Sequence, residues 1–183
     1  MRITIIGHSQ LPRDNGHFDG HHVRWFRLGG ADLRDVGGID RRLGLALTEP
    51  QDIIILFLGG NDVFRYSRKE NKENLSSVIN TLKGLTPMLY VIPLEARDYR
   101  KHPRKIWAAR WKYYNEERGV LNKQIRRGVY SIGYRTINLS TADFCDRRPD
   151  GVHFTWLGRY RFYMKIRRTV LRRVEEIAEQ NRV

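Results

Sequence analysis

A chain of 183 residues with a formal net charge of +14 is long enough for one hydrophobic core, and we expect a single domain over residues 1–183. Its longest apolar runs fall far short of the ~20 residues that cross a bilayer, which excludes a transmembrane helix, and Met1 leads straight into an apolar run, so we expect no signal peptide. The single cysteine, Cys145, excludes a disulfide framework, and together these features predict a cytoplasmic protein.

Short apolar runs alternate with longer amphipathic stretches along the chain. Continuous apolar character, clearest in Ile53–Leu58, is typical of a strand buried on both faces of a parallel sheet. The expected strands are Arg2–Ile6, Val23–Leu28, Asp52–Leu58, Met88–Ile92 and Arg135–Leu139. The expected helices are Ala31–Leu47, Arg68–Leu85, Lys105–Tyr130 and Thr155–Glu179. This alternation predicts a three-layer α/β/α fold, doubly wound around a parallel sheet of about five strands.

Polar and glycine residues follow the expected strands. Ser9 comes after the first strand, Gly30 after the second and Asn61 after the third. Because ligands of open α/β sheets bind beyond the carboxyl ends of the strands, we expect these residues to share one edge. An Asp/His pair, Asp150 and His153, precedes the last helix. A serine, a glycine, an asparagine and this pair, in this order, predict an acyl-transfer site.

Four sequence blocks resemble the SGNH hydrolase superfamily, also called the GDSL family, and occur in its order. They are Gly7-His8-Ser9-Gln10-Leu11, Leu28-Gly29-Gly30-Ala31, Gly59-Gly60-Asn61-Asp62 and Asp150-Gly151-Val152-His153. Each block is weak evidence by itself, whereas four in order at suitable spacings are specific and cover most of the chain. The resemblance implies an SGNH or flavodoxin-like fold and a serine esterase for short-chain acyl esters that needs no metal or cofactor.

The resemblance also implies a role for each residue. Ser9 attacks the ester carbonyl, and His153 takes the serine proton and later protonates the leaving alcohol. Asp150 orients the imidazole and stabilises its cation. The backbone N–H groups of Ser9 and Gly30 and the side-chain amide of Asn61 donate hydrogen bonds to the oxyanion. Glycine is expected at position 30 because a side chain there would block the close approach of the substrate.

One residue departs from the family pattern, because His8 stands where the family usually has Asp. This change leaves two interpretations open. His8 either weakens the enzyme or suits an anionic substrate. The chain is accordingly either an esterase or a catalytically idle SGNH scaffold that acts as a basic nucleic-acid or protein interaction module.

A closer resemblance links the chain to the esterase domains that animal LINE-type retrotransposons encode in their first open reading frame protein. It rests on the run Asp150–Gly158, on Tyr114-Asn115 with Arg118 and Asn122, and on the Arg-rich terminal helix. This resemblance implies a setting beside nucleic acid.

Basic residues concentrate in two segments. Arg97–Arg135 holds twelve Lys or Arg against three acidic residues, and Arg159–Arg173 of the C-terminal helix holds seven and no acidic residue. Solvated helix faces and phosphate-contacting surfaces both have such compositions. The expected partners are therefore an acyl-ester substrate and, through these segments, nucleic acid, while the oligomeric state stays open.

Two further features favour structural interpretations. His17, Asp19, His21 and His22 form a dense polar cluster, but adjacent histidines rarely ligate one ion together, which favours solvated loop residues over a metal site. Asp19 or His22 could line the cleft, because this loop follows the nucleophile block. The lone cysteine is interpreted as a small buried or loop residue rather than a reactive thiol.

Overall fold

The computed structural model describes residues 1–8, 11, 16–34, 51–97, 105–131, 135–137, 148, 150 and 152–180. The expected nucleophile Ser9, the cysteine Cys145 and residues 35–47 of one expected helix lie outside the described residues. The start of that helix is described, and residues 31–34 are not helical. The Leu33 N–H donates to the Asp62 carboxylate, which holds the segment in another conformation.

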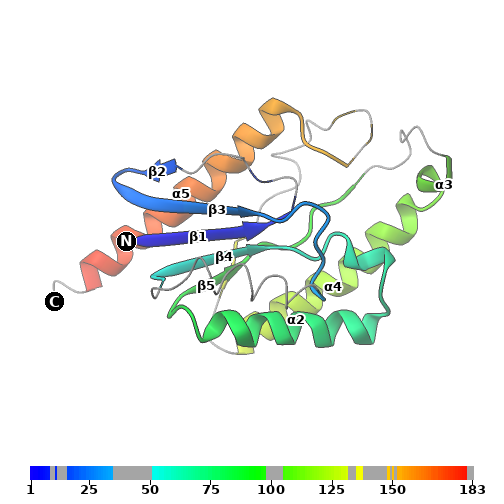
Figure 1. Cartoon of the computed structure of the whole chain (residues 1–183), viewed down its shortest axis with the longest axis horizontal. Helices are drawn as coiled ribbons and strands as arrows, with labels where there is room; N and C mark the ends of the chain where they lie inside the picture. The colour runs from blue at the N-terminus through cyan, green and yellow to red at the C-terminus, as the bar shows by residue number, and fades with distance from the viewer. Residues whose placement is uncertain are drawn as a thin grey trace.

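The described part of the chain contains a sheet of six strands (Figure 1). The strands are β1 Arg2–Gly7, β2 Gly16–Phe18, β3 His21–Arg27, β4 Ile53–Phe57, β5 Leu89–Val91 and β6 Arg135–Thr136. Their spatial order is β2-β3-β1-β4-β5-β6, and every neighbouring pair is parallel except β2 and β3. The expected parallel sheet of about five strands is confirmed, and β2 adds an antiparallel edge strand.

Helices cover both faces of this sheet. They are α2 Arg68–Lys83, the short α3 Lys105–Ala108, α4 Trp111–Ser131 and α5 Trp156–Gln180, with a 3-10 turn η1 at Asp62–Phe64. Ser67 starts α2 through a capping box with Glu70. The expected helix over 105–130 is divided into α3 and α4, and none of the described helices is long and apolar enough to cross a membrane.

Two hydrophobic cores lie on opposite faces of the sheet, because side chains alternate along each strand. Ile54 and Leu56 of β4 pack in the core that contains the apolar faces of α2 and α4. Ile53, Ile55 and Phe57 pack in the core that contains the apolar face of α5. Figure 1 shows α2 and α4 on one side of the strands and α5 on the other, which confirms the three-layer architecture.

The hairpin of β2 and β3 corrects the interpretation of the histidine cluster. Asp19 and Gly20 both have left-handed backbone, with φ of 47° and 86°, as a two-residue hairpin turn requires. His17 pairs with His22 across the hairpin, so these residues belong to strands rather than to a loop. The turn precedes β3 and lies at the amino edge of the sheet, so neither Asp19 nor His22 lines a cleft at the opposite edge. Asp19 instead forms an ion pair with Arg167 of α5.

The strand order identifies where a ligand should bind. Numbered along the chain, the five parallel strands lie in the flavodoxin-like order 2-1-3-4-5. In this order the crevice opens between the first and third parallel strands, which are β1 and β4 here. The carboxyl edge, as we call the side of the sheet where the parallel strands end, therefore holds the candidate site.

Candidate active site

Three strand ends are held together at the carboxyl edge. The His8 N–H donates to the Phe57 carbonyl at 3.3 Å, and the Leu28 N–H donates to the Gly7 carbonyl at 2.7 Å. Gly7 has no room for a side chain, because a Cβ there would lie 2.8 Å from the Phe57 oxygen. The first three sequence blocks therefore meet where β1, β3 and β4 end.

The glycine block forms a tight turn. The Ala31 N–H donates to the Leu28 carbonyl at 3.2 Å, and Gly30 has a φ of 74°. A turn with positive φ at its third residue is of type II, in which glycine is strongly favoured. A Cβ on Gly30 would meet no atom within 4 Å, so the backbone conformation, rather than crowding within the protein, favours glycine here.

Asn61 lies beside this turn, as the sequence predicted. Its Nδ2 donates a hydrogen bond to the Ala31 carbonyl at 2.9 Å. A side-chain amide carries two N–H groups, and this bond uses one of them. The structure thus brings Asn61 and Gly30 together, with an amide hydrogen left over for another acceptor.

Asp62 is a site residue that the sequence analysis did not single out, although it directly follows Asn61. It is fully buried, and its Oδ1 accepts the Leu33 N–H at 2.8 Å. Burial disfavours the charged carboxylate and raises the pKa of Asp62 to about 7, although the Leu33 hydrogen bond limits the rise. Asn61 and Asp62 therefore hold the two ends of the segment Ala31–Leu33.

Asp32 fastens the same segment from its outer side. Its Oδ2 accepts hydrogen bonds from Arg65 Nη1 at 2.6 Å and from the Tyr66 hydroxyl at 3.0 Å. Its Oδ1 accepts the Arg34 N–H at 3.1 Å. Asp32 and Asp62 thus both tie the glycine block to the segment that follows β4.

Asp150 and His153 form the expected pair. His153 Nδ1 lies 2.8 Å from Asp150 Oδ2, and Asp150 Oδ1 accepts the N–H groups of Val152 and His153 at 2.9 Å each. Burial opposes ionisation of Asp150, but the hydrogen bonds from the His153 ring and from both backbone groups together outweigh it and lower its pKa to about 2. Asp150 is therefore an anion at neutral pH that holds His153 by Nδ1, so Nε2 is the ring nitrogen available for proton transfer. The His153 side chain is 40% exposed.

Four packed rings connect the Asp/His block to the nucleophile block. Phe154, next to His153, packs on Phe162 of α5 with ring centroids 5.7 Å apart. Phe162 packs on Phe57 at 5.0 Å, and Phe57 packs on His8 at 4.5 Å. The residue after His153 is thereby fixed to the residue before Ser9, because both belong to one chain of ring contacts.

A buried cation, Arg97, lies beside the asparagine block. A Cβ on Gly60 would lie 3.8 Å from His8 Nε2 and would collide with the Arg97 guanidinium. Arg97 is only 6% exposed, lies over the Tyr114 ring at 4.9 Å and pairs with Glu95 at 3.7 Å. The sequence predicted that Arg97 contributes to a basic surface. This prediction is wrong, because the tertiary fold buries the Arg97 side chain.

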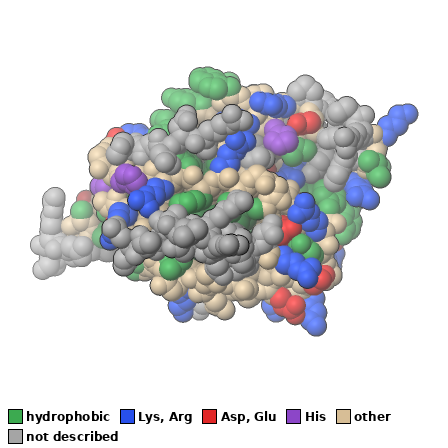
Figure 2. Space-filling model, viewed as in Figure 1, with side chains coloured by type: hydrophobic (Ala, Val, Ile, Leu, Met, Phe, Trp, Pro, Cys, Tyr) green, Lys and Arg blue, Asp and Glu red, His purple; other side chains and the backbone are tan. Residues whose placement is uncertain are grey.

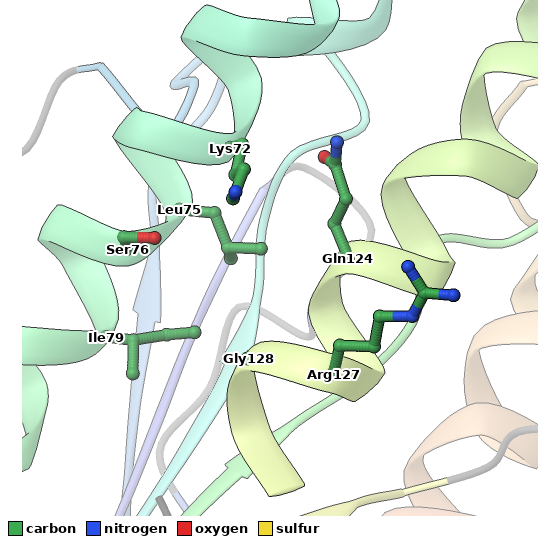
Figure 3. A pocket seen from close by; sticks show the side chains of 7 residues that line it. All are labelled: Lys72, Leu75, Ser76, Ile79, Gln124, Arg127 and Gly128. Carbon is green, nitrogen blue, oxygen red and sulfur yellow. The ribbon is translucent and has the colours of Figure 1, made fainter. Parts of the chain in front are cut away.

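The described cavities lie elsewhere. A groove of about 440 Å³ lies between α2 and α4 and is lined by Lys72, Leu75, Ser76, Ile79, Gln124, Arg127 and Gly128 (Figure 3). A second cavity, of about 230 Å³, is lined by Tyr90, Tyr130, Thr136, Thr169, Arg172, Arg173 and Glu176. Neither includes a residue of the four blocks, and the carboxyl edge adjoins segments outside the described residues. Within the residues that are described, no group of three or more His, Cys, Asp or Glu could hold a metal ion.

The chain is similar to several known proteins in sequence or in fold. The family model of GDSL-like lipases and acylhydrolases matches residues 10–166. A lipase/acylhydrolase from Enterococcus faecalis has a similar structure, with a TM-score of 0.71 and 18% identity over 94% of this chain and 96% of that chain. No curated protein matches the sequence.

Two esterases of known structure are also similar. An acetylxylan esterase from Geobacillus stearothermophilus has a TM-score of 0.65 and 14% identity over 91% of this chain and 92% of its own. An aryl esterase from M. smegmatis has a TM-score of 0.65 and 16% identity over 92% of this chain and 97% of its own. At these identities the likeness shows the fold, and the expected SGNH-type fold is confirmed.

Proposed function

Because the chain belongs to the GDSL-like lipase/acylhydrolase family, we propose that it is a serine esterase that hydrolyses short-chain acyl esters through an acyl-Ser9 intermediate. The main support is the Asp150–His153 pair at 2.8 Å, which the chain of four rings connects to His8, the neighbour of Ser9. Family membership supports hydrolysis of acyl esters in general, and the geometry supports a serine mechanism.

In the proposed mechanism, Ser9 Oγ attacks the ester carbonyl carbon while His153 Nε2 takes the hydroxyl proton. The anionic Asp150 holds Nδ1 and stabilises the imidazolium that forms. The N–H groups of Ser9 and Gly30 and the second amide N–H of Asn61 stabilise the oxyanion. When the C–O bond to the alcohol breaks, His153 returns its proton to the leaving oxygen. Water then attacks the acyl-enzyme by the same proton transfers and releases the acid.

The acyl group in this proposal is short, of the acetyl type. The sequence has no long insertion between its blocks that would build a lid over a long acyl chain. An acetylxylan esterase also stands among the similar structures. Acetyl and butyryl esters should therefore be hydrolysed faster than esters of acids with about eight carbons or more, because a shallow site cannot cover the longer chain.

A cytoplasmic setting close to nucleic acid, as the resemblance to retrotransposon esterase domains implies, is part of the proposal. Its support is the net charge of +14. The expected basic surface is smaller than the sequence suggested, since Arg167 pairs with Asp19 and Arg173 pairs with Glu176. In α5, Arg168 is exposed and remains a candidate for phosphate contact.

The decisive experiment measures p-nitrophenyl acetate hydrolysis by Ser9→Ala, His153→Ala and the double variant. Members of one catalytic unit are not additive, so each single change should lower kcat to a similar floor and the double change should lower it no further. Asp150→Ala should cost less than either. Ser77→Ala, at an exposed position of α2, is the matched control and should keep wild-type activity.

A fluorophosphonate probe identifies the nucleophile directly. The probe should label Ser9 in the wild type, as mapped by mass spectrometry, and should not label His153→Ala at a measurable rate. Multiplicative effects of the two single changes would contradict a shared mechanism. An unlabelled Ser9 in a folded protein without esterase activity would favour the idle scaffold.

A further inference from the structure

The first turns of α5 expose three large apolar side chains directly after His153. Trp156 is 78% exposed, Leu157 40% and Tyr160 49%. Figure 2 shows hydrophobic side chains protruding at the top of the molecule, over this end of α5. Other residues of the helix, Phe162 and Ile166, pack against the sheet. Core packing therefore does not explain the three exposed side chains.

Two of these side chains, Trp156 and Tyr160, stack on each other and form an aromatic platform whose outer ring face is flat. The rings of Trp156 and Tyr160 are nearly parallel, with an interplanar angle of 7° and centroids 5.7 Å apart. Thr155 caps the helix, because its Oγ1 accepts the Gly158 N–H at 3.2 Å, and Phe154 before it is fully buried. The helix turn that carries the platform is therefore fixed at its start, which limits the entropy that the platform would lose when it binds a ligand.

In the proposed reaction the alcohol leaves next to His153, which precedes the platform by only a few residues. His153 must return a proton to the oxygen of the departing alcohol, so the alcohol half of the ester lies next to His153, and the carbonyl oxygen points to the oxyanion donors. Trp156 follows His153 by three residues, and three residues span at most about 11 Å. An alcohol larger than a few atoms would therefore reach the platform.

The shape and charge of the platform restrict the alcohol. A flat aromatic face gains most from a ring that lies parallel to it, whereas a linear alkyl chain covers less of the face and loses more rotational freedom. The segment from Gly151 to Arg173 contains no acidic residue, and Arg161 is exposed next to Tyr160. Asp150 is already paired with His153, so the charge that this segment adds near the platform is positive and disfavours a cationic alcohol.

We propose that Trp156 and Tyr160 form a subsite for the alcohol half of the ester, and that this alcohol is a neutral or anionic ring with a flat apolar face. An aryl group and a sugar ring both have this chemistry. The inference rests on the proposed function, since it takes His153 as the group that protonates the leaving oxygen.

The test compares acetate esters that share one acyl group and differ in the alcohol. The substrates are phenyl acetate, a methyl xyloside monoacetate and n-butyl acetate, and each variant is compared with the wild type on the same substrate, which removes differences in intrinsic reactivity. Trp156→Ala should lower kcat/KM about fivefold for one or both ring esters, mainly through KM, because a stacked ring contact contributes roughly 1 kcal/mol. Its effect on n-butyl acetate should stay within about twofold.

Matched variants separate the subsite from general effects. Trp156→Phe should restore most of the activity on ring esters. Tyr130→Ala, which removes another exposed aromatic ring near β6, should change none of the three substrates. Loss on phenyl acetate alone would identify an aryl site, and loss on the xyloside alone a sugar site. An equal loss on ring and linear esters, or no loss, would overturn the proposal.

Binding gives a readout that does not need catalysis. In the Ser9→Ala variant, calorimetry should detect tighter binding of phenol or methyl xyloside than of n-butanol, and Trp156→Ala should remove the difference. If the ring compounds bind in this way but the wild type shows no Ser9-dependent hydrolysis, the proposed esterase function is refuted and the proposed ring-binding subsite is supported. Equal binding of all three alcohols, together with loss of binding to phosphatidylglycerol vesicles in Trp156→Ala and Leu157→Ala, would identify a membrane anchor instead.

Discussion

At the scale of single residues, the adjacent Asn61 and Asp62 hold the glycine turn, one as a hydrogen-bond donor and the other as an acceptor. Asn61 donates to the Ala31 carbonyl, and Asp62 accepts the Leu33 N–H. Each such hydrogen bond contributes about 1 kcal/mol, and both hold the segment Ala31–Leu33 that directly follows Gly30. Asp62 does this while fully buried, which makes its ionisation costly.

Asp62 should make the protein less stable as pH rises. Its pKa is raised from 3.8 to about 7, so the folded protein retains a proton that the unfolded chain releases. Stability should fall as pH rises from about 4 to about 7 and stay low above that, by at most roughly 4 kcal/mol. Asp62→Asn keeps the oxygen that accepts the Leu33 N–H and cannot ionise, so the fall should be absent in this variant.

Urea unfolding between pH 5 and pH 8 measures this effect. Asp150 does not affect the change of stability within this pH range. Its pKa is lowered to about 2, so its stabilising effect is lost only as pH falls below about 4. Asp52→Asn, directly before β4, is the control and should follow the wild-type pH dependence. Parallel curves for the wild type and Asp62→Asn would contradict the role of Asp62.

At the scale of elements, strand ends and tight turns position the site. β1, β3 and β4 end side by side, and the turn Leu28–Ala31 brings Gly30 to the end of β4. The turn depends on one left-handed residue, because Gly30 has a φ of 74° whereas its neighbour Gly29 has no positive φ. The two glycines therefore form a natural matched pair.

Gly30→Ala should be more harmful than Gly29→Ala. An alanine at positive φ is strained by roughly 1 kcal/mol, although the space around Gly30 is open. Gly29→Ala should be neutral or slightly stabilising, since alanine reduces the freedom of the unfolded chain. Urea unfolding measures the difference. Gly30→Ala should also lower kcat at least about tenfold by turning the N–H away from the oxyanion. Equal stability and equal kcat in both variants would show that the turn does not need glycine at position 30.

At the scale of the whole molecule, the basic residues on the face shown in Figure 2 are spread rather than gathered. Figure 2 shows Lys and Arg side chains at several separate places on the visible face. Part of the charge of α5 is neutralised by ion pairs to Asp19 and Glu176. Contact with a polyanion would therefore involve exposed basic residues on more than one element, and Arg126 on α4 and Arg168 on α5 are both exposed.

Binding to single-stranded RNA should weaken steeply as salt rises, because each neutralised phosphate releases roughly 0.7 of a counterion. The double change Arg126→Glu and Arg168→Glu should weaken binding and flatten this salt dependence. The double change Arg167→Glu and Arg173→Glu alters net charge equally but reverses residues that are already paired, and should weaken binding less. Filter binding at several salt concentrations measures both. Binding that is absent at low salt, or insensitive to salt, would remove the support for a nucleic-acid setting.

The arrangement of helices and strands could be predicted from the sequence because it depends on local patterns. Continuous apolar runs indicated the buried strands, and apolar residues every three or four positions indicated α5, whose bounds agree within one residue. The blocks around Gly30, Asn61 and His153 could be placed for the same reason, since each follows or precedes a recognisable element. What the sequence determined by itself is the layered arrangement and the edge at which the candidate site is expected.

Only the tertiary structure decided the environment of individual side chains. Arg97 belongs to a basic segment in sequence, yet it is buried against Gly60 and Tyr114, because residues far apart in the chain close around it. The pKa of Asp62 and the chain of rings between Phe154 and His8 likewise arise from contacts across the fold. Periodicity is a property of near neighbours, whereas burial and electrostatics depend on every element that packs nearby, so they could be known only from the folded chain.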